Sequence, residues 1–253
     1  MEYGLKQYIF VIRELTVREI KRKYSRSMLG VFWSVLQPFL YMCVMTLVFS
    51  GFTFNISSYP AYYIIGFTLW TMFITSTTTS MTAFVDNRNL FQKSKLPSEI
   101  FVLSRVYTAF VNLLFSCVTI FVVILFFRIK ITWTILIFFV DILFELMFTT
   151  GISYIFATIY VFNRDIKFLW KNLSIILVHM IAVLIPIERY PEHIQVYTKY
   201  NPLYIYPNIA RDAILNGTYN VDELLRMVIW AVVSLAVGIL VFRIKENDIV
   251  MKL

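Results

Sequence analysis

Long apolar runs dominate this sequence, and short clusters of charged residues separate them. Of its 253 residues, 59% are hydrophobic and only 15% are charged, whereas an average soluble domain has about 25% charged residues. A water-soluble core of this size cannot bury that much apolar surface, so we expect lipid to surround most of the chain. The net charge of +8 lies in the clusters between apolar runs, a pattern typical of membrane proteins and not of nucleic-acid-binding proteins.

Six runs reach the roughly 20 mostly apolar residues that a membrane-spanning helix needs. They cover residues 32–53, 62–84, 100–127, 131–161, 168–187 and 224–242. The first is too long for a signal peptide, and no small-residue cleavage site follows it, so we expect it to remain in the mature protein. The sequence therefore predicts an all-α membrane protein with six transmembrane helices in a single domain over residues 1–253.

The distribution of Lys and Arg between these runs predicts the orientation of the chain. With the N-terminus in the cytoplasm, the inner segments hold 16 of these residues and the outer segments hold six, with Arg105 unassigned. Both termini are therefore expected in the cytoplasm. The long outer segment 188–222 is predicted to form two short helices, split at Asn201-Pro202, that re-enter the outer leaflet.

Residues 1–30 carry an amphipathic pattern before the first apolar run. Apolar side chains recur at steps of three and four residues from Leu5 to Ile20. Five cations follow one another closely: Arg18, Lys21, Arg22, Lys23 and Arg26. We expect a helix on the cytoplasmic leaflet whose cations face anionic head groups. A simple membrane anchor remains an alternative.

Few residues of this chain are of the types that bind metals or act as acids and bases. Cys43 and Cys117 lie inside apolar runs and are expected to be buried thiols, and no Cys/His cluster predicts a metal site. Asp141 and Glu145 lie one helical turn apart in the fourth run, and His179 lies near the middle of the fifth. We expect one of the two carboxyl groups to contact His179, either as a polar lining or as a contact between helices.

Two further groups of side chains are candidates to line a path through the membrane. The hydroxyl-rich stretch ITSTTTSMT, residues 74–82, either packs against another helix or lines a hydrated path. Aromatic rings stack on the apolar faces of sugars. The channel candidates of this kind, at the ends of the first two runs, are Phe32, Trp33, Phe39, Tyr41, Tyr62 and Trp70.

Five motifs occur in a fixed order along nearly the whole chain. Residues 21–50 combine a basic/aromatic pair, a Leu-Gly step, an aromatic-Trp-Ser step, a proline and a terminal Phe-Ser. The others are YPAYYIIGFTLWTMF, NRNLFQKSKLPSEIFVLSRV, YVFNRDI and YNPLYIYPNIARDAILNG. Together these motifs resemble those in the membrane subunits of polysaccharide and teichoic acid ABC exporters. The chain departs from that pattern at PIERYP, where Glu188 and Arg189 precede Tyr190.

The resemblance implies a homodimer of six-span subunits that works with two copies of a separate ATPase. No glycine of the chain opens a G-x-x-x-x-G-K-[ST] loop, so ATP and Mg²⁺ are expected on that partner. This chain is then expected to need no cofactor of its own and to be no enzyme. The implied function is export of a lipid-linked polysaccharide or teichoic acid-type polymer across the bacterial cytoplasmic membrane.

The inner loop 86–99 is the expected main contact with the ATPase, although an ordinary charged loop is an alternative. The residues assigned to coupling, including a smaller second contact in the loop before the fifth run, are Asp86, Arg88, Leu90, Phe91, Lys93, Lys95, Arg164 and Asp165. The five cations before the first run are expected to attract the diphosphate-linked head of the lipid substrate, at about 1 kcal/mol each.

Two other functions stay open on the sequence alone. One is an exporter of the same superfamily for a smaller substrate, such as a drug or a lipid. The other is a membrane-embedded transferase that acts on a lipid-linked sugar. A transferase needs an exposed catalytic set near the head groups, and Asp141, Glu145 and His179 lie too deep in their runs to supply it.

Overall fold

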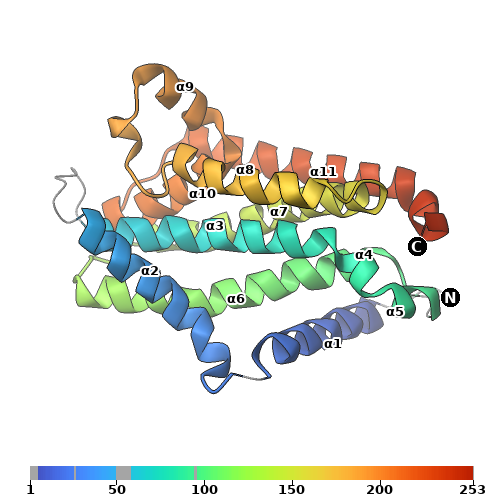
Figure 1. Ribbon diagram of the computed structural model, residues 1–253. Coiled ribbons are helices and arrows are strands. Elements are labelled where there is room, and N and C mark those ends of the chain that lie inside the picture. Colours follow the sequence, from blue (N-terminus) through green and yellow to red (C-terminus); the bar gives the residue numbers. More distant parts are fainter. Residues whose placement is uncertain (1–4, 26, 50–57, 94–95, 253) are drawn as a thin grey trace.

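The computed structural model describes residues 5–25, 27–49, 58–93 and 96–252, and these form helices and connecting turns without a strand (Figure 1). The helices in chain order are α1 (Leu5–Tyr24), η1 (Gly30–Phe32), α2 (Trp33–Phe49), α3 (Tyr59–Met81), α4 (Ala83–Asp86), α5 (Arg88–Lys93), α6 (Glu99–Phe126), α7 (Ile135–Phe162), α8 (Ile166–Met180), η2 (Ile187–Arg189), α9 (Glu192–Tyr200), α10 (Pro202–Arg211), η3 (Asp212–Asn216) and α11 (Val221–Lys252). The all-α prediction is confirmed.

Four of the described helical segments are long and apolar enough to cross a membrane: Gly30–Phe49, α6, α7 and α11. Helix α3 has 23 residues, but its Thr and Ser side chains lower its hydropathy. Helix α8 has only 15 residues and ends at Met180. The prediction of one continuous fifth run over 168–187 is therefore wrong, because the backbone leaves the helix after Met180 and turns.

Helix α3 forms the centre of the bundle, between α6 and α7 (Figure 1). Most of its side chains are buried, from Ala61 through Met81. Helices α7 and α11 run side by side and approach closely at Gly151 and Gly238. A Cβ atom at either glycine would overlap backbone atoms of the other helix. Small residues at such a crossing let two backbones pack directly.

The start of α1, the pair α4–α5 and the end of α11 lie at one end of the bundle, and α9 lies toward the other (Figure 1). An apolar cluster closes the first end, where Leu15 of α1 packs with Phe84, Phe101 and Phe242. This cluster places α1 against the loop that precedes α6.

Helix α1 covers Leu5–Tyr24 of the predicted segment 1–30, and protein covers much of its apolar face. It runs alongside the first half of α6: the Thr16 hydroxyl donates to the Ser104 carbonyl at 3.4 Å. Leu15 and Thr16 are buried, whereas Ile9 is 57% exposed. Helix α6 and the apolar cluster behind it thus cover part of the apolar face of α1, and its position on the cytoplasmic leaflet stays a prediction.

The segment 188–222 contains two helices that meet at the predicted position. Helix α9 ends at Tyr200, and α10 begins at Pro202. The Asn201 side chain accepts a hydrogen bond from the Leu203 N–H at 3.0 Å, which satisfies a free N–H at the start of α10. Proline fits the first turn of a helix because its missing N–H would have no partner there.

Candidate functional site

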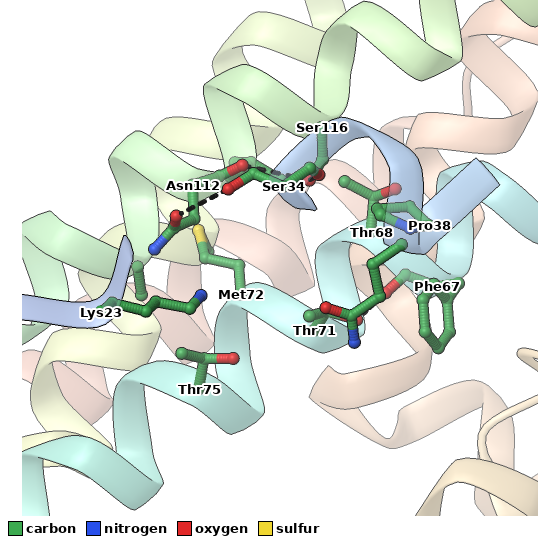
Figure 2. A pocket seen from close by; sticks show the side chains of 13 residues that line it. Lys23, Ser34, Pro38, Phe67, Thr68, Thr71, Met72, Thr75, Asn112 and Ser116 are labelled. Atoms are coloured by element: carbon green, nitrogen blue, oxygen red, sulfur yellow. Dashed lines mark hydrogen bonds between the residues drawn. The ribbon is translucent and has the colours of Figure 1, made fainter. Parts of the chain in front are cut away.

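A polar groove opens between α2, α3 and α6 (Figure 2). Its volume is about 200 Å³, and its polar lining includes Thr68, Thr71, Thr75, Asn112 and Ser116. The end of α1 reaches the same space, where Lys23 extends toward Thr75 and Asn112 in the close view (Figure 2). We call this space, together with the adjoining pocket described next, the polar groove.

The adjoining pocket extends the polar groove toward the end of the bundle that holds α4. It shares Lys23, Thr75 and Asn112 with the first pocket and adds Glu19, Arg22, Thr79, Arg105 and Thr108. The groove therefore runs from the basic end of α1 along the seam between α3 and α6. Its walls change from charged side chains to hydroxyls and amides along this path.

The hydroxyl-rich stretch of α3 supplies one wall. The Thr71 hydroxyl donates to the Phe67 carbonyl at 2.7 Å, and the Thr79 hydroxyl donates to the Thr75 carbonyl at 2.7 Å. These bonds to the preceding turn satisfy the donors, so hydroxyl oxygens can stay in an apolar environment at small cost. They remain able to accept hydrogen bonds from a bound molecule.

The opposite wall is held by polar contacts between α2 and α6. The Ser116 hydroxyl donates to the Ser34 carbonyl at 3.0 Å, and the Ser34 hydroxyl bonds Asn112 Oδ1 at 3.2 Å. The Thr119 hydroxyl donates to the Val35 carbonyl at 3.0 Å. These bonds fix α2 at a defined distance from α6 and so hold the groove open at this level.

The predicted basic residues of α1 divide into different environments. Lys23 lines the groove, and Lys21 is exposed. Arg22 pairs with Glu19 at 3.1 Å, and Arg18 donates to Asn87 of the loop before α5. The remaining predicted cation, at position 26, lies outside the described residues.

An ion-pair cluster joins three helices at the charged end of the groove. Arg105 of α6 bonds Glu19 of α1 at 2.5 Å and Asp86 of α4 at 2.8 Å. Arg105 and Glu19 are both buried. From the sequence, Arg105 is assigned to neither side of the membrane, and Glu19 is not recognised as its partner. A single cation in an apolar run must find an anion, and this rule could have prompted a search for its partner.

A phenol contact ties the start of α1 to the start of α6. The Tyr8 hydroxyl donates to Glu99 Oε2 at 3.1 Å. Burial, with the nearby Glu99 carboxylate adding to it, raises the pKa of the Tyr8 phenol. The phenol therefore keeps its proton and remains a donor across the whole physiological range.

The residues predicted for coupling lie at the turns that leave the bundle near α1. Asp86 is engaged by Arg105 and by the Thr82 hydroxyl at 2.8 Å, Arg88 is exposed, and Leu90 packs against the apolar cluster of Leu15. Phe91 and Lys93 belong to α5 but their side chains, like the whole of Lys95, lie outside the described part of the chain. Arg164 and Asp165 are exposed at the turn before α8.

The aromatic candidates separate into an exposed and a buried set. Phe32, Trp33, Phe39 and Tyr41 are exposed on η1 and α2. Tyr62 and Trp70 are each 8% exposed and pack inside the bundle, and their role as channel residues stays a prediction. Hydropathy could not reveal this, since α3 is surrounded by other helices and its aromatic side chains pack inside the bundle.

Arg211 at the end of α10 is buried at 2% exposure and holds the turn that follows α8. Its guanidinium donates to the Tyr62, Ala182 and Val183 carbonyls at 3.1, 2.9 and 3.2 Å. Ala182 has a positive φ of 53° and, like Val183, follows the end of α8 at Met180, so no helix supplies partners for the carbonyls of these two residues. Gly66 faces the guanidinium, and a Cβ atom there would collide with it.

The predicted contact between an intramembrane carboxyl group and His179 is absent. His179 is exposed, and its Nδ1 bonds the Ile175 carbonyl of its own helix at 2.8 Å. Asp141 and Glu145 are buried, and neither pairs with a His among the ion pairs of the described residues. The prediction is wrong because equal depth along two helices does not imply that the two side chains face one another.

Comparison with known proteins places this fold in a family. The sequence model of the family described as ABC-2 type transporter matches residues 11–215. This range includes the whole polar groove and Arg211. The chain belongs to the ABC-2 type transporter family. Two relatives are both called O-antigen export system permease protein RfbA. The one from Klebsiella pneumoniae is 26% identical over 96% of this chain and 94% of its own length, and the one from Myxococcus xanthus is 32% identical over 73% and 71%.

As an ABC-2 type transporter, this chain is a multi-pass membrane protein with a role in transport. A role in transport does not require a catalytic set. The features that sequence reasoning missed in this transporter are contacts between helices: the Glu19–Arg105–Asp86 cluster and the carbonyls bound by Arg211.

Proposed function

We propose that this chain is the permease subunit of an ATP-driven exporter that moves a lipid-linked polysaccharide or teichoic acid-type polymer across the bacterial cytoplasmic membrane. Family membership and the names of the relatives support the class of substrate. The observation that carries the proposal is the polar groove, which begins at cationic side chains and continues as a path of hydroxyls and amides.

The charged end of the groove suits an anionic head group. Lys23 and Arg22 line it, with Arg18 and Lys21 on the same helix. Glu19 balances part of this charge, which leaves Lys23 as the cation best placed to meet a phosphate at the groove. The hydroxyls of α3 then offer a succession of similar weak partners, which suits a long and repetitive glycan better than one tight site.

The proposed topology has six spans: α2, α3, α6, α7, α8 with the turn after it, and α11. Both termini lie in the cytoplasm, and α9 and α10 re-enter the membrane from the outside. Support comes from the start of α1 and the end of α11 at one end of the bundle (Figure 1). The contacts of Arg211 also support this topology. A broken helix is tolerated at membrane depth only where its carbonyls have partners, and Arg211 donates to the Ala182 and Val183 carbonyls after α8.

Two ATPase copies would bind the α4–α5 loop, with the turn at Arg164 and Asp165 as a second contact. Asp86 ends α4 and bonds Arg105, which in turn bonds Glu19 of α1. A displacement of α4 by the ATPase would thus reach the helix that carries the groove cations. Two copies of this chain would pair, with exposed aromatic side chains such as Trp33 and Tyr41 along the polymer path.

Depletion of the chain in its host tests the proposed substrate class. Lipid-linked polymer should accumulate in the cytoplasm, and an ATPase subunit should copurify with the tagged chain. If depletion leaves cytoplasmic glycan unchanged while efflux of a drug or a lipid falls, the substrate assignment is wrong and the smaller-substrate exporter is correct. If no ATPase copurifies under conditions that keep the chain folded, the ATP-driven mechanism is wrong.

A further inference from the structure

Two carboxyl groups lie inside the bundle on one face of α7. Asp141 and Glu145 are one helical turn apart and are 0% and 3% exposed. Both oxygens of Asp141, and Oε2 of Glu145, have no hydrogen-bond partner among the described residues. Neither residue lines the polar groove. The proposed export function therefore leaves this pair without a role.

Among the described residues, no positive charge pairs with either carboxyl group. From α6 and α10, the titratable side chains within electrostatic range are Cys117 and Tyr206. The Tyr206 hydroxyl donates to the Met227 carbonyl at 3.2 Å and so is not directed at a carboxyl group. Neither carboxyl group has a Lys, Arg or His partner among the ion pairs of the described residues.

Apolar side chains also pack against this part of α7. Ile142, which follows Asp141, packs in a cluster with Ile65 and Leu69 of α3. Phe148, at the next turn after Glu145, packs with Met227 of α11. The described surroundings of the pair thus include hydrocarbon, a thiol, a phenol and the buried hydroxyl of Thr149 one turn after Glu145, but no cation.

Ionisation of both groups in such surroundings is strongly unfavourable. A single carboxylate at the middle of a membrane helix is costly on the insertion scale, and two neighbouring carboxylates repel one another as well. A protonated carboxyl group avoids both costs, and two carboxyl groups can share a proton through a hydrogen bond after a change of rotamer.

We propose that Asp141 and Glu145 form a proton-binding pair that keeps α7 packed against α3 and α6. In the packed bundle the pair holds at least one proton. Loss of that proton leaves uncompensated charge between apolar helices, so α7 separates from its neighbours and water reaches the pair. The pair is thus a pH-sensitive contact within the transporter, independent of which polymer the chain exports.

Infrared spectroscopy of the full chain in lipid nanodiscs tests the protonation directly. At neutral pH, the difference spectrum between the wild type and an Asp141→Asn, Glu145→Gln double variant should contain the carbonyl band of a protonated carboxylic acid. The matched control is a Glu192→Gln, Asp222→Asn double variant, which changes two exposed carboxylates and should lose only carboxylate bands. If the Asp141/Glu145 difference contains carboxylate bands alone, the proposal is wrong.

Thermal unfolding of the same samples tests the consequence for packing. Between about pH 6 and about pH 9, the unfolding temperature of the wild type and of the control should fall, because charging a buried acid favours the unfolded state. The Asn/Gln variant should lose this fall. If the double variant does not fold, the test is the pH titration of the carboxylic acid carbonyl band in the infrared spectrum of the wild type. Absence of that band at neutral pH overturns the proposal. Restoration of wild-type stability at high pH by added Na⁺ would identify a cation site instead.

Discussion

The guanidinium carbon of Arg211 lies 3.6 Å from the centre of the Tyr62 ring. The same guanidinium donates to the carbonyl of Tyr62, and the Tyr62 hydroxyl donates to the Ala182 carbonyl at 2.8 Å. One cation and one phenol from distant parts of the sequence thus supply the partners of a turn that has left the helix. Without them, the backbone between α8 and η2 would carry unpaired carbonyls in a buried environment.

Replacement of Arg211 by Lys should destabilise the chain strongly. An ammonium group cannot reach three carbonyls in a planar arrangement, and removal of one partner from a buried charged contact costs about 3 to 5 kcal/mol. Tyr62→Phe should cost about 1 to 3 kcal/mol, since it leaves the Ala182 carbonyl with fewer partners. Thermal unfolding in nanodiscs measures both. Equal unfolding temperatures for wild type and Arg211→Lys would mean that this contact does not hold the turn.

Larger side chains at the α7–α11 crossing should prevent these helices from packing. Gly151→Leu or Gly238→Leu places a side chain against the backbone of the facing helix, so we expect loss of folded protein from the membrane fraction. Ala236→Leu, on an exposed position of α11, is the matched control and should be tolerated. Normal yields of monodisperse protein for both glycine variants would contradict the close approach.

The Glu19–Arg105–Asp86 cluster should be needed for transport as well as for packing. Arg105→Glu places three acids together, and we expect both reduced unfolding temperature and loss of export. Combined reversal, Glu19→Arg with Arg105→Glu, restores one opposite-charge pair and should recover part of both. Export assays at matched expression measure the recovery. A double variant no better than Arg105→Glu would indicate that the two residues do not act as a pair.

Charge reversal in the α4–α5 loop should separate ATP hydrolysis from export. With Arg88→Glu and Lys93→Glu, we expect the chain to reach the membrane while export falls, because the loop no longer matches the ATPase surface. Lys199→Glu, on an exposed position of α9 at the other end of the bundle, serves as control. ATPase activity and polymer export are measured on the same complexes. Unchanged export by the loop variant would refute the coupling assignment.

Charge reversal at the groove should reduce export more than reversal beside it. Lys23→Glu puts a negative charge in the polar groove, whereas Lys21→Glu changes an exposed cation on the same helix. Both alter the net charge of α1 equally. We expect a loss of export of at least several-fold for Lys23→Glu alone, measured as surface polymer at matched protein levels. Equal losses would mean that α1 acts through its total charge and not through the groove.

Composition and patterning alone determine a good part of this protein. An excess of apolar residues with interspersed basic clusters requires a helical membrane chain, because helices satisfy every backbone group internally. Local signals also place the helix that ends near Tyr24, the split at Asn201-Pro202 and the loop before Glu99 close to where the structure has them. These features depend on neighbours in sequence, so they can be predicted from it.

Only the tertiary structure decides which faces meet. Trp33 and Trp70 lie in similarly apolar runs, yet one is exposed and the other is buried. In the sequence, neither Arg105 nor Arg211 has an evident partner. The structure places Glu19 beside Arg105 and the Ala182 carbonyl beside Arg211. In a membrane helix, both lipid and protein favour apolar side chains, so hydropathy does not distinguish the packed face from the lipid face. That choice depends on the fit between helices and on polar partners far away in the sequence.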